Sequence, residues 1–341
     1  MSPDQEANRV SVVIATLNSA RYLDECLGAL RDQDYPRDLV EIVIADGGST
    51  DDTLEIAARH GAERIVENRL RTGEAGKAAG VKVAGGDILV FVDSDNIVIG
   101  RDWLARMLAP FHDPEVIATE VARWDYRRDD HYINRWHALT GVADPLTLYV
   151  GNYCRESLVT GAWTGFPYRA ERRDGWEKVT LDPDAVPVLG ANGFAIRRRA
   201  FDEVPVGDYL FDLDHVYDLV QRGHHVFGRV DASVHHYFCD SLDAFRRKTR
   251  RRGDDFLYYS SQGKRSYPWA KRQRRAIPAF IASTVSVVPV FLDSLRGYRR
   301  RPDAAWAFHV AACWITLVVY AFSAIRGTLR PRELDRRDWR Q

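Results

Sequence analysis

The run VSVVIAT at residues 10–16 decides the fold, together with VEIVIAD at residues 40–46. Both runs are short, rich in β-branched side chains and apolar at successive positions, which predicts strands that are buried on both faces. Two further strands are expected at residues 63–67 and 87–93, and helices are expected to begin near Ala20, Asp51 and Gly76. This alternation of strands and helices predicts an α/β fold with a mostly parallel central sheet and flanking helices.

Weaker patterns follow along the chain. Residues 116–122 and 226–234 resemble strands, whereas residues 124–168 show no clear period. Residues 188–199 indicate a turn and a short strand or helix, and residues 212–223 have the period of an amphipathic helix. Three of the strongly predicted strands end in the polar residues Thr16, Asp46 and Asp93. Ligands of open α/β sheets bind at the carboxyl ends of the strands, so we expect these three side chains at one rim.

The most specific local pattern is VFVDSDN at residues 90–96, a strand that ends in two carboxylates separated by one residue. The two-residue period of extended chain points Asp93 and Asp95 to the same side. Hard oxygen ligands placed in this way suit Mg²⁺ or Mn²⁺ that carries a diphosphate. The alternative is a solvated, aspartate-rich turn.

A second strand end is followed by a glycine turn and an acidic first helical turn, DGGSTDDT at residues 46–53. Asp46 can accept a hydrogen bond from a nucleobase, and Gly47 allows the backbone to approach a ligand closely. Thr16 and Asn18 supply small polar groups where the first strand ends. The alternative for residues 46–53 is an ordinary helix cap.

The segment GEAGKAAG at residues 73–80 predicts the start of a helix with Lys77 in its first turn. A helix N-terminus and a lysine together can hold a diphosphate. Taken alone, however, Lys77 is better explained as an ordinary surface lysine.

The chain has 341 residues, 45% of them apolar, which allows a large core and excludes disordered and collagen-like proteins. Its four cysteines lie far apart and none forms a CxxC pair, so we expect neither a disulfide framework nor a zinc site: Cys26, Cys154, Cys239 and Cys313. A reducing cytosolic location fits this usage. The polar N-terminal residues do not resemble a secretory signal.

The zero net charge conceals an uneven distribution. Residues 246–275 carry a net charge of +10 and residues 276–341 one of +5, which leaves −15 for residues 1–245. The basic segment is compatible with a nucleic-acid patch, a diphosphate clamp or a membrane-surface helix. No nucleic-acid motif accompanies it and apolar sequence follows it, so the membrane is favoured and nucleic acid is not expected as a partner.

Two runs free of Asp, Glu, Lys and Arg follow, at residues 276–292 and 304–325. As helices they would extend about 25 Å and about 33 Å, so only the second is clearly long enough to span a bilayer. In a simple hairpin, the intervening loop with Arg296, Arg299, Arg300 and Arg301 would lie outside, against the positive-inside tendency. We therefore expect a re-entrant or in-plane first run, or an exception to the rule; two buried core helices are the alternative.

Taken together, these motifs resemble the family 2 glycosyltransferases of the GT-A fold, which are inverting enzymes that use nucleotide-diphosphate sugars. Residues 15–18 resemble the opening of that family, residues 46–51 its nucleoside loop, residues 76–78 its pyrophosphate-side helix and residues 93–95 its DxD metal motif. The resemblance implies that Asp95 ligates the cation and that Asp93 supports the sugar and ribose. It also extends to the membrane-associated members of the family, which place an Arg-bearing interfacial helix after the catalytic domain.

In the later half, residues 190–198 resemble the family's acceptor-facing loop. About twenty residues on, the family carries its general base, which the resemblance assigns to Asp212, with Asp214 as the alternative. Inversion needs such a carboxylate to deprotonate the attacking hydroxyl. Some relatives bind metal through a histidine near His235; a structural histidine is the alternative.

The sequence therefore predicts an inverting, metal-dependent glycosyltransferase that moves a sugar from a nucleotide-diphosphate donor to a lipid-linked or glycan acceptor. Its catalytic domain (residues 1–240) would face the cytoplasm at the cell membrane, followed by a basic interfacial segment (241–275) and a hydrophobic helix pair (276–341). A sugar nucleotidyltransferase and a non-catalytic sugar-nucleotide-binding membrane protein are the alternatives.

Overall fold

The computed structural model describes residues 8–190 and 192–329. Contacts divide these residues into two compact units. The sheet unit comprises residues 8–122 and 168–235, and the helical unit comprises residues 123–167 and 236–329. The boundary expected at residue 240 thus describes only part of the division, because residues 123–167 group with the C-terminal helices. Residues 1–7, where no secretory signal is expected, lie outside the described residues.

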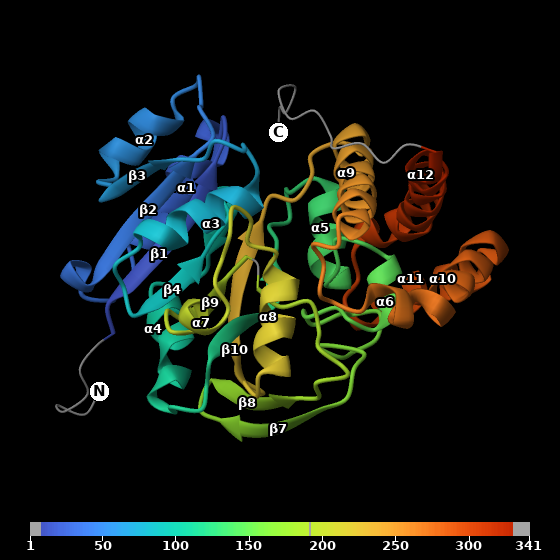
Figure 1. The fold of residues 1–341 in the computed structure, drawn as a ribbon. Coiled ribbons are helices and arrows are strands. Elements are labelled where there is room, and N and C mark those ends of the chain that lie inside the picture. Colours follow the sequence, from blue (N-terminus) through green and yellow to red (C-terminus); the bar gives the residue numbers. More distant parts are fainter. Residues whose placement is uncertain (1–7, 191, 330–341) are drawn as a thin grey trace. The chain divides into compact units, whose positions relative to one another are not determined.

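The sheet unit contains one mixed sheet with the strand order β3-β2-β1-β4-β9-β6-β10-β8-β7, while β5 pairs with β10 (Figure 1). The strands are β1 (Val10–Thr16), β2 (Val40–Asp46), β3 (Arg64–Glu67), β4 (Ile88–Phe91), β5 (Asn96–Val98), β6 (Ala118–Asp125), β7 (Tyr168–Arg173), β8 (Trp176–Leu181), β9 (Phe194–Arg197) and β10 (Val226–His236). The four strands from β3 to β4 are parallel to one another, whereas β9 pairs antiparallel with β4 and with β6. The α/β class is confirmed, with its parallel part in the N-terminal half.

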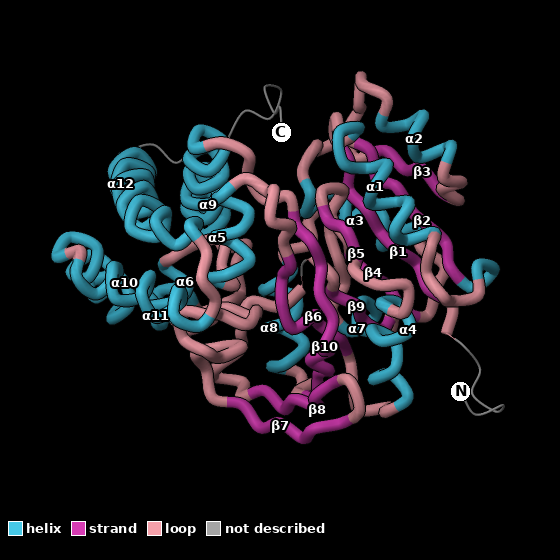
Figure 2. The backbone as a smooth tube through the Cα atoms, turned by 180° about the vertical axis from the view of Figure 1, so that it is seen from behind, coloured by secondary structure: helices cyan, strands magenta, loops and turns pink. Residues whose placement is uncertain are grey.

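Helices cover both faces of the parallel strands (Figures 1 and 2). The helices of this unit are α1 (Ala20–Arg31), α2 (Thr53–Arg59), α3 (Gly73–Val83), α4 (Trp103–Leu108), α7 (Ala200–Glu203) and α8 (Asp212–Gln221), with 3-10 turns η1 (Arg37–Leu39) and η2 (Ala109–His112). Helix α3 packs closely on β1, because a Cβ atom on Gly76 would lie 2.5 Å from the Cβ of Ala15. This contact brings the first turns of α3 to the carboxyl end of β1.

The helical unit has α5 (Tyr132–Thr140), α6 (Leu146–Val150), α9 (Leu242–Ser261), α10 (Trp269–Ser286), α11 (Val288–Arg300), η3 (Ala304–Ala307) and α12 (Phe308–Leu329). Its core is aromatic: Trp136 of α5 meets Phe245 of α9 and Phe308 of α12 edge to face, with ring centroids 5.7 and 5.3 Å apart. These contacts explain why residues 123–167 belong with the tail. The cysteines Cys26, Cys154, Cys239 and Cys313 are free in the structure.

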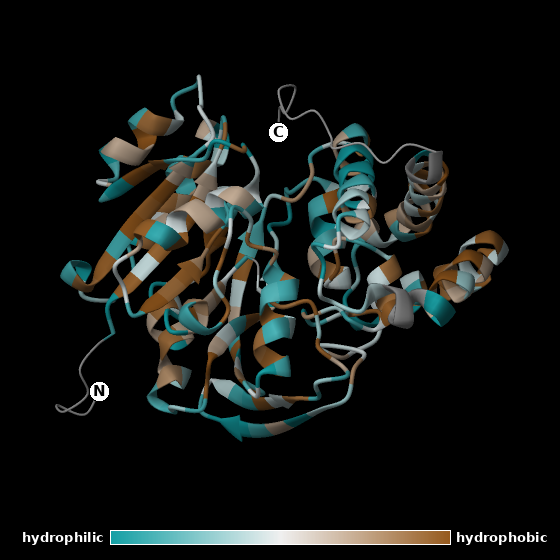
Figure 3. Ribbon diagram, in the orientation of Figure 1, coloured by the Kyte–Doolittle hydropathy of each residue, from teal (hydrophilic) through white to brown (hydrophobic). Residues whose placement is uncertain are grey.

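The apolar run at residues 276–292 is not one straight helix. Val287, with φ of 64°, separates α10 from α11, and the two segments Arg274–Ser286 and Val288–Arg300 meet at 87°. The arginines 296, 299 and 300, expected in a loop, lie within α11. By length and composition, Ala304–Arg326 could cross a membrane, and the bent pair could form a broken span or a re-entrant loop. Figure 3 shows the apolar character of α12 beside the largely hydrophilic α9.

Candidate active site

The loop that follows β2 is organised by Asp46. One carboxylate oxygen accepts hydrogen bonds from the hydroxyls of Thr16 (2.9 Å) and Ser49, and the other accepts the backbone N–H groups of Gly48 and Ser49, both at 2.8 Å. Four donors fill the lone-pair positions of a carboxylate. Asp46 therefore shapes the loop, and its expected contact with a nucleobase would have to replace or share one of these bonds.

Asn18 joins the loops after β1 and β2. Its Oδ1 accepts the backbone N–H of Thr50 at 2.8 Å, and its own backbone N–H donates to the Ser49 hydroxyl at 2.8 Å. Asn18 occupies the left-handed region, with φ of 50°, which asparagine tolerates better than most residues. A side chain at Gly47 would be crowded, because a Cβ atom would lie 3.3 Å from Leu17 and 3.4 Å from the Cα of Arg71. Two predicted binding loops thus form one rigid surface.

Lys77 is buried, with only 5% of its surface exposed, so the surface-lysine alternative is wrong. Helix α3 begins three residues earlier than expected, at Gly73, and is capped by the Thr72 hydroxyl, which accepts the Ala75 N–H. Lys77 therefore lies in the second turn rather than the first. Its Nζ atom is 2.9 Å from Oδ2 of Asp212 and 3.7 Å from Oδ1 of Asp93.

The ion pair and its burial shift the pKa values of both Lys77 and Asp212. Burial alone would lower the pKa of Lys77, but the negative charges of Asp212 and Asp93 outweigh it and hold the pKa above the usual value. Burial raises the pKa of Asp212 to about 6, against the opposing charge of Lys77. Oδ1 of Asp212 is buried without a hydrogen-bond partner among the described residues. Lys77 is therefore a fixed cation, and Asp212 is a carboxylate with one unused oxygen and a pKa near neutrality.

The backbone around Gly190 supports Asp212. Gly190 has φ of 119°, and a Cβ atom there would lie 2.6 Å from the Cβ of Asp212, so only glycine fits. Its N–H donates to Oε2 of the buried Glu120 at 3.1 Å. The N–H of Gly193 donates to the Phe91 carbonyl at 2.9 Å and ties the predicted acceptor loop to the end of β4. Ala191 in that loop lies outside the described residues.

Asp93 and Asp95 follow β4 on the segment that leads to β5. The Asp93 side chain is 36% exposed, and Oδ1 of Asp95 accepts a hydrogen bond from Asn96 Nδ2 at 2.7 Å. No group of three or more His, Cys, Asp or Glu side chains is arranged for a metal within residues 8–190 and 192–329. Two carboxylates nevertheless fit Mg²⁺ or Mn²⁺, because Mg²⁺ in particular is usually held by one or two carboxylates, substrate phosphates and water.

Two further predicted residues are buried. Asp214 lies two residues after Asp212 in α8, so the two side chains differ in direction by about 200°. Asp212 is the one that contacts Lys77, and the role of Asp214 as the alternative base stays a prediction. His235 is buried on β10, the strand that pairs with β5, and it belongs to no metal-holding group among the described residues. Its role as a ligand stays a prediction.

The sequence analysis missed two residues of this region. Glu120 is only 2% exposed, and its position in an apolar strand was a readable signal. Cys26 lies behind the aspartate loop, with its Sγ 3.8 Å from the Asp93 carbonyl oxygen. Burial, together with the charges of Asp95 and Asp93, raises the pKa of this thiol, so it is not a nucleophile.

The chain is similar in sequence to known glycosyltransferases. Glycosyltransferase AglE of Haloferax volcanii is 35% identical over 102 residues, which are 28% of this chain and 33% of that protein. A dolichyl N-acetyl-alpha-D-glucosaminyl phosphate 3-beta-D-2,3-diacetamido-2,3-dideoxy-beta-D-glucuronosyltransferase of Methanococcus voltae is 37% identical over 92 residues, 24% of this chain and 28% of that protein. The chain thus matches a third or less of the length of these relatives.

Among solved structures, the mannosyltransferase PcManGT from Pyrobaculum calidifontis, in complex with GDP-Man and Mn²⁺, aligns with 93% of this chain and 88% of its own. The TM-score is 0.54 at 17% identity, which confirms the expected GT-A fold. The model of glycosyl transferase family 2 matches residues 11–204, more than half of the chain. The chain therefore belongs to glycosyl transferase family 2.

Proposed function

We propose that this protein is an inverting, metal-dependent glycosyltransferase that moves a sugar from a nucleotide-diphosphate donor to an acceptor hydroxyl. The observation that carries the proposal is the position of Lys77, whose Nζ lies between Asp93 and Asp212. The ammonium group places a fixed positive charge between the predicted metal motif and the predicted base. A charge there is useful to a reaction that expels a diphosphate on one side and takes up a proton on the other.

The donor would lie on the joined loops after β1 and β2, with the nucleoside against Thr16, Asn18, Asp46 and Gly47. Asp95 would hold Mg²⁺ or Mn²⁺ with support from Asp93, and a bound cation would neutralise charge on the departing diphosphate. The complex of PcManGT with GDP-Man and Mn²⁺ is compatible with a donor of this class. Lys77, already charged and desolvated, would stabilise the same leaving group without reorganisation.

Asp212 would act as the general base. Its unpartnered Oδ1 can accept the proton of the acceptor hydroxyl, and a pKa of about 6 keeps it mostly ionised at pH 7. In one displacement, the acceptor oxygen bonds to the anomeric carbon, the bond from that carbon to the diphosphate oxygen breaks, and the proton passes to Asp212. Attack from the side opposite the diphosphate inverts the anomeric configuration.

The acceptor is proposed to be lipid-linked or a glycan on a lipid, and the protein to act at a membrane with its catalytic part towards the cytoplasm. Helix α12 is long and apolar enough to span a bilayer. The bent corner between α10 and α11 exposes Val285, Val288 and Phe291, each about 60% accessible. The Methanococcus relative carries a dolichyl phosphate substrate in its name, which supports a lipid-linked acceptor.

Donor turnover tests the proposal directly. Purified protein is incubated with a panel of nucleotide sugars and Mn²⁺, and release of nucleoside diphosphate is measured with Asp212→Asn and Asp95→Ala beside the wild type. Both variants should lose turnover, while Asp208→Asn, which changes an exposed aspartate paired with Lys82, should retain it. Formation of pyrophosphate instead of nucleoside diphosphate would identify a nucleotidyltransferase. Folded protein that binds donors without turning any of them over would indicate a non-catalytic binding protein.

A further inference from the structure

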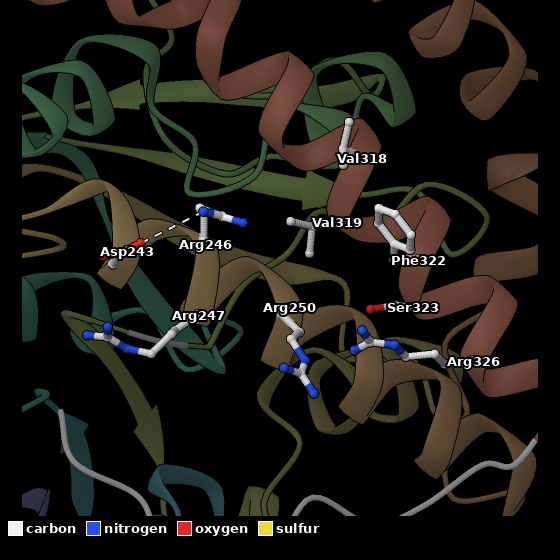
Figure 4. A pocket seen from close by; sticks show the side chains of 9 residues that line it. All are labelled: Asp243, Arg246, Arg247, Arg250, Val318, Val319, Phe322, Ser323 and Arg326. Carbon is white, nitrogen blue, oxygen red and sulfur yellow. Dashed lines mark ion pairs between the residues drawn. The ribbon is translucent and has the colours of Figure 1, made fainter.

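A basic groove runs along the seam between α9 and α12, within the helical unit (Figure 4). Its volume is about 410 Å³, and it continues into a second hollow of about 770 Å³ that shares Asp243, Arg246, Val318 and Val319. One wall of the first hollow is arginine-rich and belongs to α9; the other is apolar and belongs to α12, which adds Arg326 at its end.

The charges of this groove are poorly balanced. Four arginines, Arg246, Arg247, Arg250 and Arg326, and one carboxylate, Asp243, line it, which gives a net charge of +3. Arg246 faces Asp243 at 3.9 Å, and Arg250 reaches Asp254 at 3.3 Å. Among the described residues, Arg247 and Arg326 have no carboxylate within 4.0 Å. The guanidinium groups of Arg250 and Arg326 approach each other from opposite walls beside Ser323 (Figure 4).

The opposite wall is an exposed apolar stripe. Trp314, Val318 and Phe322 are 37%, 45% and 57% exposed, and their spacing of four residues places them on one face of α12. All three line one or both of the hollows. Exposed apolar side chains beside an arginine-rich wall form the kind of surface that an amphiphile with an anionic head would cover.

The two helices that form the groove are firmly packed. Phe245 of α9 meets Phe308 of α12 with ring centroids 5.3 Å apart, and farther along α9 a Cβ atom on Gly253 would lie 3.1 Å from the Tyr320 ring. The half-buried Arg252 of α9 donates to the Ala143 carbonyl. The walls are therefore fixed before a ligand arrives, which reduces the entropy lost on binding.

We propose that this groove binds a lipid with a terminal phosphate. The phosphate would lie between Arg250 and Arg326, since paired guanidinium groups recognise phosphate oxygens through bidentate hydrogen bonds. The hydrocarbon chain would lie along Phe322, Val318 and Trp314. A nucleic acid is disfavoured because one side of the groove is apolar. The inference stands apart from the proposed catalysis and does not require it.

Vesicle binding of the full chain tests the inference without any donor sugar. Phosphatidylcholine vesicles are doped with phosphatidic acid, or with phosphatidylserine to the same measured surface charge, and binding is followed by co-flotation. Wild-type protein should prefer phosphatidic acid by at least about tenfold, the factor that one hydrogen bond to a charged group supplies. Arg250→Gln/Arg326→Gln should lose that preference, whereas Arg296→Gln/Arg299→Gln, which removes two exposed arginines of α11, should keep it. Both substituted pairs are surface residues, and thermal unfolding checks that each variant is folded.

Several outcomes would overturn the inference. Equal binding of wild type to both vesicle types would show that the groove responds only to the surface charge of the membrane. Inorganic phosphate that displaces the protein from phosphatidic acid at micromolar concentration would indicate a site for free phosphate. An oligonucleotide that competes more strongly than either lipid would assign the groove to nucleic acid. Phe322→Gln should weaken binding to phosphatidic acid vesicles several-fold, and an unchanged affinity would remove the apolar wall from the site.

Discussion

Substitution of Lys77 by methionine separates two effects that the structure assigns to one side chain. The thioether side chain has a similar length but no charge, so Asp212 and Asp93 lose their shared cation. Loss of a neighbouring positive charge raises a carboxyl pKa by about 1–3. The pKa of Asp212, about 6 in the wild type, should therefore rise to between about 7 and 9.

The expected loss of turnover in Lys77→Met follows from the two roles of Lys77, as the cation beside Asp212 and as the charge near the leaving diphosphate. At pH 7 the ionised fraction of Asp212 would fall about 2-fold to 100-fold, and the base-dependent rate would fall with it. Loss of a preorganised charge at the leaving diphosphate would cost a further factor of about 10²–10³ at every pH. Lys77→Met should thus reduce turnover at pH 7 by between about 10² and 10⁵.

The assay is a pH profile of nucleoside diphosphate release for wild type, Lys77→Met and Lys82→Met. Lys82 lies on the same helix but is 52% exposed and pairs with Asp208, so it provides the matched control. The acidic limb of Lys77→Met should move to higher pH, and activity should recover only in part at pH 9. An acidic limb that stays in place after removal of Lys77 would refute the assignment of Asp212 as the base controlled by this lysine.

Three further predictions address the same site. Gly190→Ala should destabilise the fold by about 1–3 kcal/mol in thermal unfolding and reduce turnover, since its φ of 119° and the 2.6 Å approach to Asp212 exclude a side chain; an unchanged melting temperature would contradict this. Because the pKa of Asp212 is higher in the folded protein than in the unfolded chain, this group stabilises the fold at low pH, and its contribution is lost as the pH rises through about 6. Between pH 4 and pH 7, the free energy of unfolding of wild type should therefore fall by about 1–3 kcal/mol relative to that of Asp212→Asn; parallel stability curves would exclude the shift. Chelation of divalent cations should abolish stabilisation by a nucleoside diphosphate in wild type, while Asp95→Ala should show no such stabilisation even with Mn²⁺; stabilisation that persists in either experiment would remove Asp95 as a ligand.

Sequence predicted the parallel half of the sheet closely because its strands combine apolar runs with polar ends. The bounds of β1 and β2 agree with the expected residues 10–16 and 40–46. The start of α3 lies three residues before the expected Gly76, because the Thr72 hydroxyl caps a helix whose first turn contains two poor helix formers, Gly73 and Gly76. This difference also places Lys77 in the second turn of its helix rather than the first.

Local sequence patterns do not predict contacts between residues that are far apart in the chain. Lys77 and Asp212 are 135 residues apart in the chain, and nothing near either residue reveals the ion pair that buries the lysine. The break at Val287 was equally hidden, since valine rarely adopts a positive φ. By contrast, the hairpin of β7 and β8 has a local signal: Asp174-Gly175 lies between two strand-like stretches, and Gly175 has a positive φ of 73°, which favours glycine at the second central position of a turn.

The central claim is that the carboxyl ends of the parallel strands form one site for a cation-bound donor, with Lys77 and Asp212 beside it. Crystals of the protein with Mn²⁺ and a nucleoside diphosphate, measured at the manganese absorption edge, test this claim most directly. The account predicts an anomalous peak at bonding distance from Asp95, with the diphosphate between that peak and Lys77. A manganese peak remote from Asp93 and Asp95, or a diphosphate bound in another part of the protein, would contradict it.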